Sequence, residues 1–131
     1  MSFVDSSALV ALIAAEPEGE AIAAQLEKQP PHFTSPLVMF ETVVALCRIR
    51  RVPIDQITFV VHDFLARARI AIEPVEADTY ITALQVYERY GKGSGHPARL
   101  NFGDCFSYAA AIRSGVPLIY KGNDFAQTDL A

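Results

Sequence analysis

The sequence contains no tryptophan and few cysteines. Cys47 and Cys105 are the only cysteines among 131 residues, and both lie in apolar stretches, where a free cysteine behaves as a small hydrophobic residue. Two such residues do not make a disulfide framework or a zinc site. A reducing compartment suits this chain best, and we expect a cytoplasmic protein.

The sequence also has no apolar run of the length that crosses a membrane. The apolar stretch 8–15 is too short, and Asp5 precedes it where a signal peptide would carry basic residues. We therefore expect neither a signal peptide nor a membrane partner.

Positive charge is scarce, since 11 Lys and Arg residues stand against 15 Asp and Glu, for a formal net charge of −4. Proteins that bind nucleic acid through phosphate contacts usually carry a basic excess. Four acids discussed below account for the whole difference, so the charge argues only weakly against a nuclease. The chain is 51% hydrophobic and 20% charged, which is typical of a globular domain with some apolar surface for a partner.

Short strands alternate with helices along the chain. The apolar and turn patterns predict strands at 2–4, 32–34, 70–75 and 116–120, and helices at 8–15, 17–28, 37–50, 53–69, 76–90 and 101–114. Ser35 before a proline is a strong helix start, and Gly115 is a strong helix end. This alternation predicts an α/β fold with a mostly parallel sheet and helices on both faces. We find no internal repeat and expect one domain over residues 1–131.

Four acidic residues lie either just after a predicted strand or near the start of a predicted helix. Asp5 follows the first strand and Asp124 the last, while Glu41 and Asp104 lie near helix starts. In a parallel α/β sheet, ligands bind outside the carboxyl ends of the strands, and helices begin on that same edge. The chain geometry therefore allows all four carboxylates to meet.

Three of these acids also have purely structural explanations. Taken alone, Asp5 is more simply explained as the N-cap of the helix that follows it. Asp104 stands three residues after Asn101, in an arrangement that resembles a capping box and favours the helix dipole. Asp124 lies in a Gly-Asn-Asp turn, where such residues are common for local reasons.

Glu41 has no comparable explanation. The helix around it is apolar on nearly every face, and no Lys or Arg stands three or four residues away. A carboxylate in such surroundings is costly unless it is paired, hydrogen-bonded or bound to a metal. The four acids together suit the hard cations Mg²⁺ and Mn²⁺, which activate water for attack on a phosphodiester. We therefore predict a catalytic metal site formed by these four carboxylates.

Four stretches resemble the PIN-domain ribonucleases. They are residues 5–9 (Asp-Ser-Ser-Ala-Leu), Glu41 on an early apolar helix, residues 100–106 (Leu-Asn-Phe-Gly-Asp-Cys-Phe) and residues 121–125 (Lys-Gly-Asn-Asp-Phe). The resemblance covers nearly the whole chain, and the last two stretches are its most specific parts. Within this group the chain is similar to the VapC toxins of toxin–antitoxin pairs.

The resemblance implies a three-layer α/β/α fold with a mostly parallel five-stranded sheet, and Mg²⁺- or Mn²⁺-dependent endonucleolytic cleavage of RNA. It also implies inhibition by a small VapB-like antitoxin and favours a homodimer. Asp5 and Asp104 match the family's principal metal ligands. Glu41 and Asp124 match its remaining acids, and Ser6 matches a hydroxyl position beside the first acid.

The residues that would hold RNA are less clearly marked. Lys92, His96 and Arg99 lie on the glycine-rich loop before Asp104, where cations and flexible backbone N–H groups suit phosphate contact. A solvated loop with ordinary surface charges explains them equally well. No aromatic pattern for base stacking is apparent.

Apolar helix residues exceed what one small domain obviously hides. Most are expected in the core and the rest at a homodimer contact or a groove for an antitoxin helix; they include Ile57, Val60, Val61, Phe64 and Leu65. The last edge strand is expected to be short, and Asp129 is expected to be a solvated end residue.

Two other classes of protein compete with this hypothesis. A phospho-acceptor signalling domain also binds Mg²⁺ through acids at strand ends, but it needs adjacent acids after its first strand. The chain has Asp5-Ser6 there, and Thr34-Ser35 after the second strand. The second alternative is a catalytically idle PIN-like scaffold that only binds a partner, and the intact four-acid set argues against it.

Overall fold

The computed structural model describes residues 1–130. Its strands form one sheet in the order β3-β2-β1-β4, and every neighbouring pair is parallel. The strands are β1 (Ser2–Val4), β2 (His32–Thr34), β3 (Ile70–Ile72) and β4 (Leu118–Ile119). The helices are α1 (Ser6–Ile13), α2 (Gly19–Lys28), α3 (Pro36–Arg50), α4 (Ile54–Ala68), α5 (Thr79–Tyr90), α6 (Phe102–Ser114) and the 3₁₀ helix η1 (Phe125–Gln127). The expected α/β fold with a parallel sheet is confirmed.

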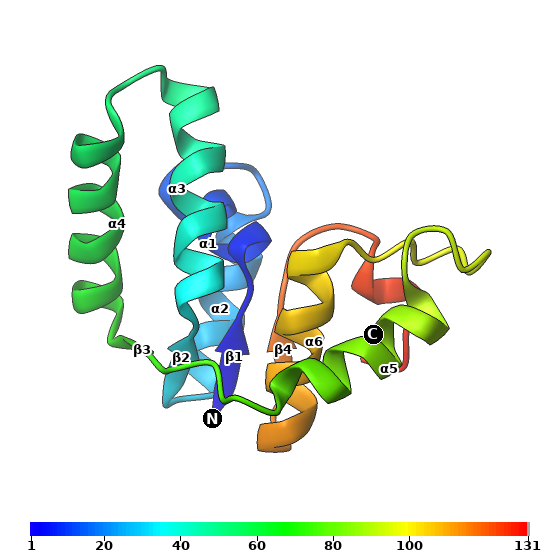
Figure 1. The fold of residues 1–131 in the computed structure, drawn as a ribbon. Helices are drawn as coiled ribbons and strands as arrows, with labels where there is room; N and C mark the ends of the chain where they lie inside the picture. The colour runs from blue at the N-terminus through cyan, green and yellow to red at the C-terminus, as the bar shows by residue number, and fades with distance from the viewer. Residues whose placement is uncertain (131) are drawn as a thin grey trace.

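The helices lie in two groups beside the sheet (Figure 1). In one group α1 packs on α2 and α3, and α3 packs on α4, whereas α5 and α6 form the other. α6 also contacts β1, β4 and α3. The two groups therefore meet where α3 contacts α6, close to the central strand β1.

The direction in which strands are added to the sheet reverses at β1. The chain crosses from β1 to β2 and β3 on one side, and it returns to β4 on the other side. A crevice forms outside the carboxyl ends of the strands at such a switch point. Asp5 is the first residue after β1, so it lies at this position.

Side chains and glycine cap the helices as the sequence predicts. Asp5 is the N-cap of α1, and Ser35 is the N-cap of α3, where its Oγ accepts a hydrogen bond from Val38 N at 3.2 Å. Gly115 ends α6 in the left-handed conformation, with φ of 65°. These caps determine where the acid-bearing helices begin and end.

Several elements are shorter than predicted. β3 ends at Ile72, two residues before Pro74, which has no N–H to pair, and β4 has only two residues. After β4 the chain forms η1, and no fifth strand exists within residues 1–130. Phe125 of η1 is only 2% exposed. Burial of this aromatic ring, and not strand pairing, therefore anchors the segment after β4.

The hydrophobic core lies between the sheet and the helices. Among its fully buried side chains are Phe3, Leu9, Leu46, Leu100 and Ile119. Cys105 is buried and Cys47 half-buried, and both are free thiols. On α4, Ile57, Val61 and Leu65 are buried, whereas Val60 is exposed. Among the described residues, no helix has both the length and the apolarity for a membrane crossing.

We expect Leu46→Ala to lower the free energy of unfolding by about 2–5 kcal/mol, because it leaves a cavity in the core. Leu46 is 1% exposed, whereas Leu84 on α5 is 60% exposed. Urea unfolding followed by circular dichroism measures the difference, with Leu84→Ala as the control. Equal effects of the two substitutions would contradict this description of the core.

Candidate active site

Four acidic side chains gather where α3 and α6 approach the carboxyl end of β1. The charges of Asp5 and Asp104 both act on Glu41, and those of Asp5 and Asp124 act on Asp104. The structure therefore places each of the four acids that the sequence singles out within electrostatic range of at least one other. They come from four segments that are distant along the chain.

Asp5 is almost fully buried, at 2% exposure. Its Oδ2 accepts hydrogen bonds from Ser7 N at 3.1 Å and from Ser7 Oγ at 2.6 Å. Its Oδ1 is buried without a hydrogen-bond partner in the described part of the chain. Asp5 is thus a helix cap through one oxygen and has the other oxygen free.

Glu41 is half-buried on α3, and its carboxylate lies against the first turn of α6. A Cβ on Gly103 would stand 2.7 Å from Glu41 Oε1 and closer still to Oε2, so the carboxylate could keep this position only against glycine and would otherwise have to shift. Glu41 Oε1 is buried and unpaired, and no basic side chain of residues 1–130 forms an ion pair with Glu41. Glu41 is therefore not neutralised by a basic neighbour among these residues.

Burial and mutual repulsion change the acidity of two of these groups. Desolvation, reinforced by the charges of Asp5 and Asp104, raises the pKa of Glu41 to about 7. Desolvation raises the pKa of Asp104 to about 6; the backbone N–H of Asn101 opposes this rise, and the charges of Asp5 and Asp124 add to it. A positive charge at this position would favour the ionised form of both groups.

Asp104 combines two roles that the sequence presents as alternatives. Its Oδ2 accepts from Asn101 N at 3.0 Å, and its own N donates to Asn101 Oδ1 at 2.9 Å, which completes the capping box. The same side chain is half-buried beside the other acids. The capping role is confirmed, and it coexists with membership of the acid cluster.

The two acids near the C-terminus behave differently from each other. Asp124 is exposed at the start of η1, and its side chain makes no capping hydrogen bond. Asp129 is also exposed, but it accepts a hydrogen bond from Tyr108 and lies 3.9 Å from Arg89. The expectation of a solvated Asp129 is confirmed by its exposure, and the phenol of Tyr108 on α6 reaches it as well.

The acid cluster offers only oxygen atoms, and two of them, Asp5 Oδ1 and Glu41 Oε1, are buried without a partner among the described residues. This donor set fits a hard cation such as Mg²⁺ or Mn²⁺, which takes carboxylate oxygens and keeps several waters. Within residues 1–130, no group of three or more His, Cys, Asp or Glu side chains is placed so that it could hold a metal ion. The carboxylates would therefore have to move toward one another to bind a cation.

The loop residues that the sequence offers for RNA contact do not behave alike. Lys92 and Arg99 are exposed and form no ion pair among the residues described. Arg99 has the left-handed φ of 51°, which is uncommon for a residue other than glycine. His96 packs against the Tyr90 ring, and its Nδ1 accepts from Ala98 N, so it stabilises the loop.

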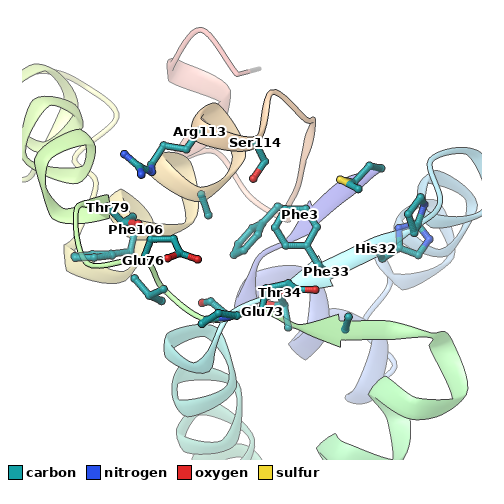
Figure 2. A pocket seen from close by; sticks show the side chains of 17 residues that line it. Phe3, His32, Phe33, Thr34, Glu73, Glu76, Thr79, Phe106, Arg113 and Ser114 are labelled. Carbon is teal, nitrogen blue, oxygen red and sulfur yellow. The ribbon is translucent and has the colours of Figure 1, made fainter.

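A cavity of about 640 Å³ lies elsewhere on the molecule. Figure 2 shows that it is lined by Phe3, Phe33 and Phe106 together with Glu73 and Glu76. None of the four clustered acids lines it. The cavity and the acid cluster are therefore separate features.

A family model described as the PIN domain matches residues 2–130. The chain belongs to the PIN domain family. A VapC ribonuclease of Rhizobium meliloti is 43% identical to this PIN domain and is covered over 99% of both chains. Ribonuclease VapC42 of Mycobacterium tuberculosis is 40% identical, with 97% of this chain and 95% of the relative covered. Within the family, the chain therefore groups with the VapC ribonucleases.

Solved structures share the fold of this PIN domain. The crystal structure of Mycobacterium tuberculosis VapC20, described as a sarcin-ricin loop cleaving toxin, has a TM-score of 0.72 at 25% identity and covers 96% of this chain and 93% of its own. A toxin–antitoxin complex from Klebsiella pneumoniae has a TM-score of 0.69 at 18% identity, with 99% and 94% covered. The second likeness concerns the fold alone.

Several residues of this site are not evident from the sequence. Ser7, and not Ser6, bonds Asp5, and Ser6 makes no side-chain hydrogen bond within residues 1–130. The signal for Ser7 is its place two residues after an N-cap. Gly103 also carries a signal, because glycine inside a helical turn weakens the helix and therefore suggests a close approach.

Two exposed aromatic rings directly precede the residues of the site. Phe40 is 71% exposed next to Glu41, and Phe102 is 67% exposed next to Gly103. Exposed aromatic faces allow unpaired bases to stack. The sequence shows no such pattern because the two rings are far apart along the chain.

We expect the metal-free protein to become more stable as the pH falls from about 8 to about 5.5. Glu41 and Asp104 have raised pKa values in the folded state, so the folded protein binds more protons than the unfolded chain across this range. In EDTA, Glu41→Gln should raise the melting temperature at about pH 8 by a few degrees and reduce the pH dependence.

Thermal unfolding of wild type, Glu41→Gln and the exposed-acid control Glu20→Gln checks this prediction. His32, whose pKa burial lowers, opposes the trend equally in all three proteins. A Glu41→Gln variant with the same pH dependence as the wild type would contradict the raised pKa of Glu41.

Proposed function

We propose that this PIN domain is a metal-dependent endoribonuclease in which Mg²⁺ or Mn²⁺ is bound by its four clustered acids. Its membership of the VapC ribonucleases makes it an endoribonuclease toxin of a toxin–antitoxin system. The observation that carries the metal assignment is the unpaired, buried carboxylate oxygen of Glu41, next to the charges of Asp5 and Asp104. Such a group is costly to bury without a compensating cation.

The proposed roles of the acids follow from how each is held. Asp5 and Asp104 are fixed by helix-capping hydrogen bonds, which suits them as the principal ligands. Glu41 completes the site from α3, and Asp124, on an exposed turn, is the ligand with the most freedom to adjust. Bound Mg²⁺ or Mn²⁺ supplies charge that polarises a phosphodiester and provides a nucleophilic water near neutral pH.

The chain's basic loop is the proposed contact for the RNA backbone. Lys92 and Arg99 carry exposed charges just before the helix that bears Asp104, and such charges position phosphates without reading sequence. Ser6 lies beside Asp5 and remains a candidate for a hydroxyl contact to substrate.

The proposed partners are a small VapB-like antitoxin and a second copy of the chain. Exposed apolar residues on two helices support the presence of protein partners. They are Ile54, Phe59 and Val60 on α4, and Tyr80, Ile81, Leu84 and Tyr87 on α5. We place the protein in the cytoplasm, where its RNA substrates occur, and treat residues 1–131 as a single domain.

The phospho-acceptor alternative has little support. β1 is followed by a single acid, Asp5, and β2 by Ser35, so no adjacent pair of acids and no acceptor aspartate stand directly after these strands. The idle-scaffold alternative is an outcome of the experiment below.

We expect Asp104→Asn to reduce RNA cleavage by about a hundredfold or more, because a neutral amide cannot replace a charged ligand of a hard cation. Asparagine can still accept the capping hydrogen bond from Asn101 N, so the fold should persist. Purified protein is incubated with total RNA and Mg²⁺ or Mn²⁺, and cleavage sites are mapped.

Asp63→Asn on α4 removes an exposed acid paired with Arg67 and serves as the control. Equal cleavage by Asp104→Asn, or cleavage that persists in EDTA, would contradict the metal assignment. A wild-type protein that binds but never cleaves RNA would favour the scaffold.

We expect the double substitution Lys92→Ala/Arg99→Ala to weaken RNA binding and to lower the slope of log affinity against log salt by about 1.4. Each lost contact to a single strand changes that slope by about 0.7. Fluorescence anisotropy in the Asp104→Asn background measures binding without cleavage. Lys28→Ala/Arg67→Ala removes the same charge from α2 and α4, and an equal change in slope would contradict the loop assignment.

A further inference from the structure

The hydroxyl group of Ser7 connects two of the segments that carry acids. Ser7 Oγ donates a hydrogen bond to Asp5 Oδ2 at 2.6 Å and accepts one from Lys121 N at 3.0 Å. Ser7 belongs to the first turn of α1, and Lys121 opens the segment that runs from β4 to Asp124. One hydroxyl therefore links the segments that follow the neighbouring strands β1 and β4.

The two bonds from Ser7 determine how the carboxylate of Asp5 is turned. Both Ser7 N and Ser7 Oγ donate to Oδ2, whereas Oδ1 is buried without a partner among the described residues. Two donors on one oxygen oppose rotation of the carboxylate, so its second oxygen faces away from Ser7. That second oxygen is the atom available to a cation.

The main chain around Lys121, whose N–H donates to Ser7 Oγ, is also held in place. Lys121 Nζ bonds Glu16 Oε1 at 2.9 Å, and Asp5 N donates to Ile119 O at 3.0 Å between β1 and β4. The main chain that donates to Ser7 Oγ is thus held on both sides. Loss of the hydroxyl would leave Lys121 N without this acceptor and would free the segment that leads to Asp124.

We propose that Ser7 is a positioning residue for the metal site. Its hydroxyl orients Asp5 and sets the spacing between Asp5 and the turn that carries Asp124. This inference rests on the proposed function, since it assigns to Ser7 a role in metal binding by these acids. Removing a group that hydrogen-bonds a metal ligand typically lowers metal affinity by about 10- to 100-fold.

Isothermal titration of the full chain with Mn²⁺ alone tests this role without relying on activity. We expect Ser7→Ala to bind Mn²⁺ about 10- to 100-fold more weakly than the wild type. Ser7→Thr keeps the hydroxyl and should restore binding to within a few-fold. Because the backbone N–H of residue 7 still donates to the N-cap Asp5 in Ser7→Ala, the helix start is preserved, and circular dichroism verifies the fold.

Two reference variants separate the possible failures. Thr58→Ala removes a helix hydroxyl that donates to Ile54 O on α4 and should bind Mn²⁺ as the wild type does, while Asp5→Asn should abolish binding. Wild-type affinity in Ser7→Ala, or equally weak binding by Ser7→Ala and Ser7→Thr, would overturn the role of Ser7 alone. A wild-type protein whose Mn²⁺ binding is unaffected by Asp5→Asn would overturn the proposed function as well.

Discussion

The main physical constraint on this structure is that it holds mutually repelling carboxylates near one another without a basic counter-charge. Burial raises the cost of ionising Glu41 and Asp104, and neighbouring charges add to it: Asp5 and Asp104 act on Glu41, and Asp5 and Asp124 act on Asp104. No arginine or lysine of the described chain neutralises Glu41. The rest of the fold must therefore supply the stability that this cluster removes.

Backbone geometry supplies the restraint that ion pairs would otherwise give. Asp5 is the N-cap of α1 and Asp104 is the N3 member of the capping box of α6, so hydrogen bonds at the helix starts also hold these acids in position. Each capping bond uses only part of the carboxylate, and in Asp5 the other oxygen stays unpaired among the described residues. Helix capping and ion binding are thus compatible roles of one side chain, although they look like competing explanations in the sequence.

Much of this site could be predicted because its signals are local. The caps Ser35 and Gly115, the alternation of strands and helices, and the unexplained Glu41 are all visible within a few residues of sequence. The structure bears out the first two and places Glu41 within electrostatic range of Asp5 and Asp104. The contacts of Ser7 and Asp129 could not be predicted. They depend on partners 114 and 21 residues away, whose positions only the folded chain determines. The expected fifth strand is replaced by burial of a ring, a choice that strand patterns do not encode.

The close approach of Glu41 to Gly103 couples two positions that are distant along the chain. A side chain at position 103 would meet the end of the glutamate, which would have to adopt another rotamer. The glycine lets the carboxylate rest against α6 without that shift, so a change at either position alters the surroundings of the other.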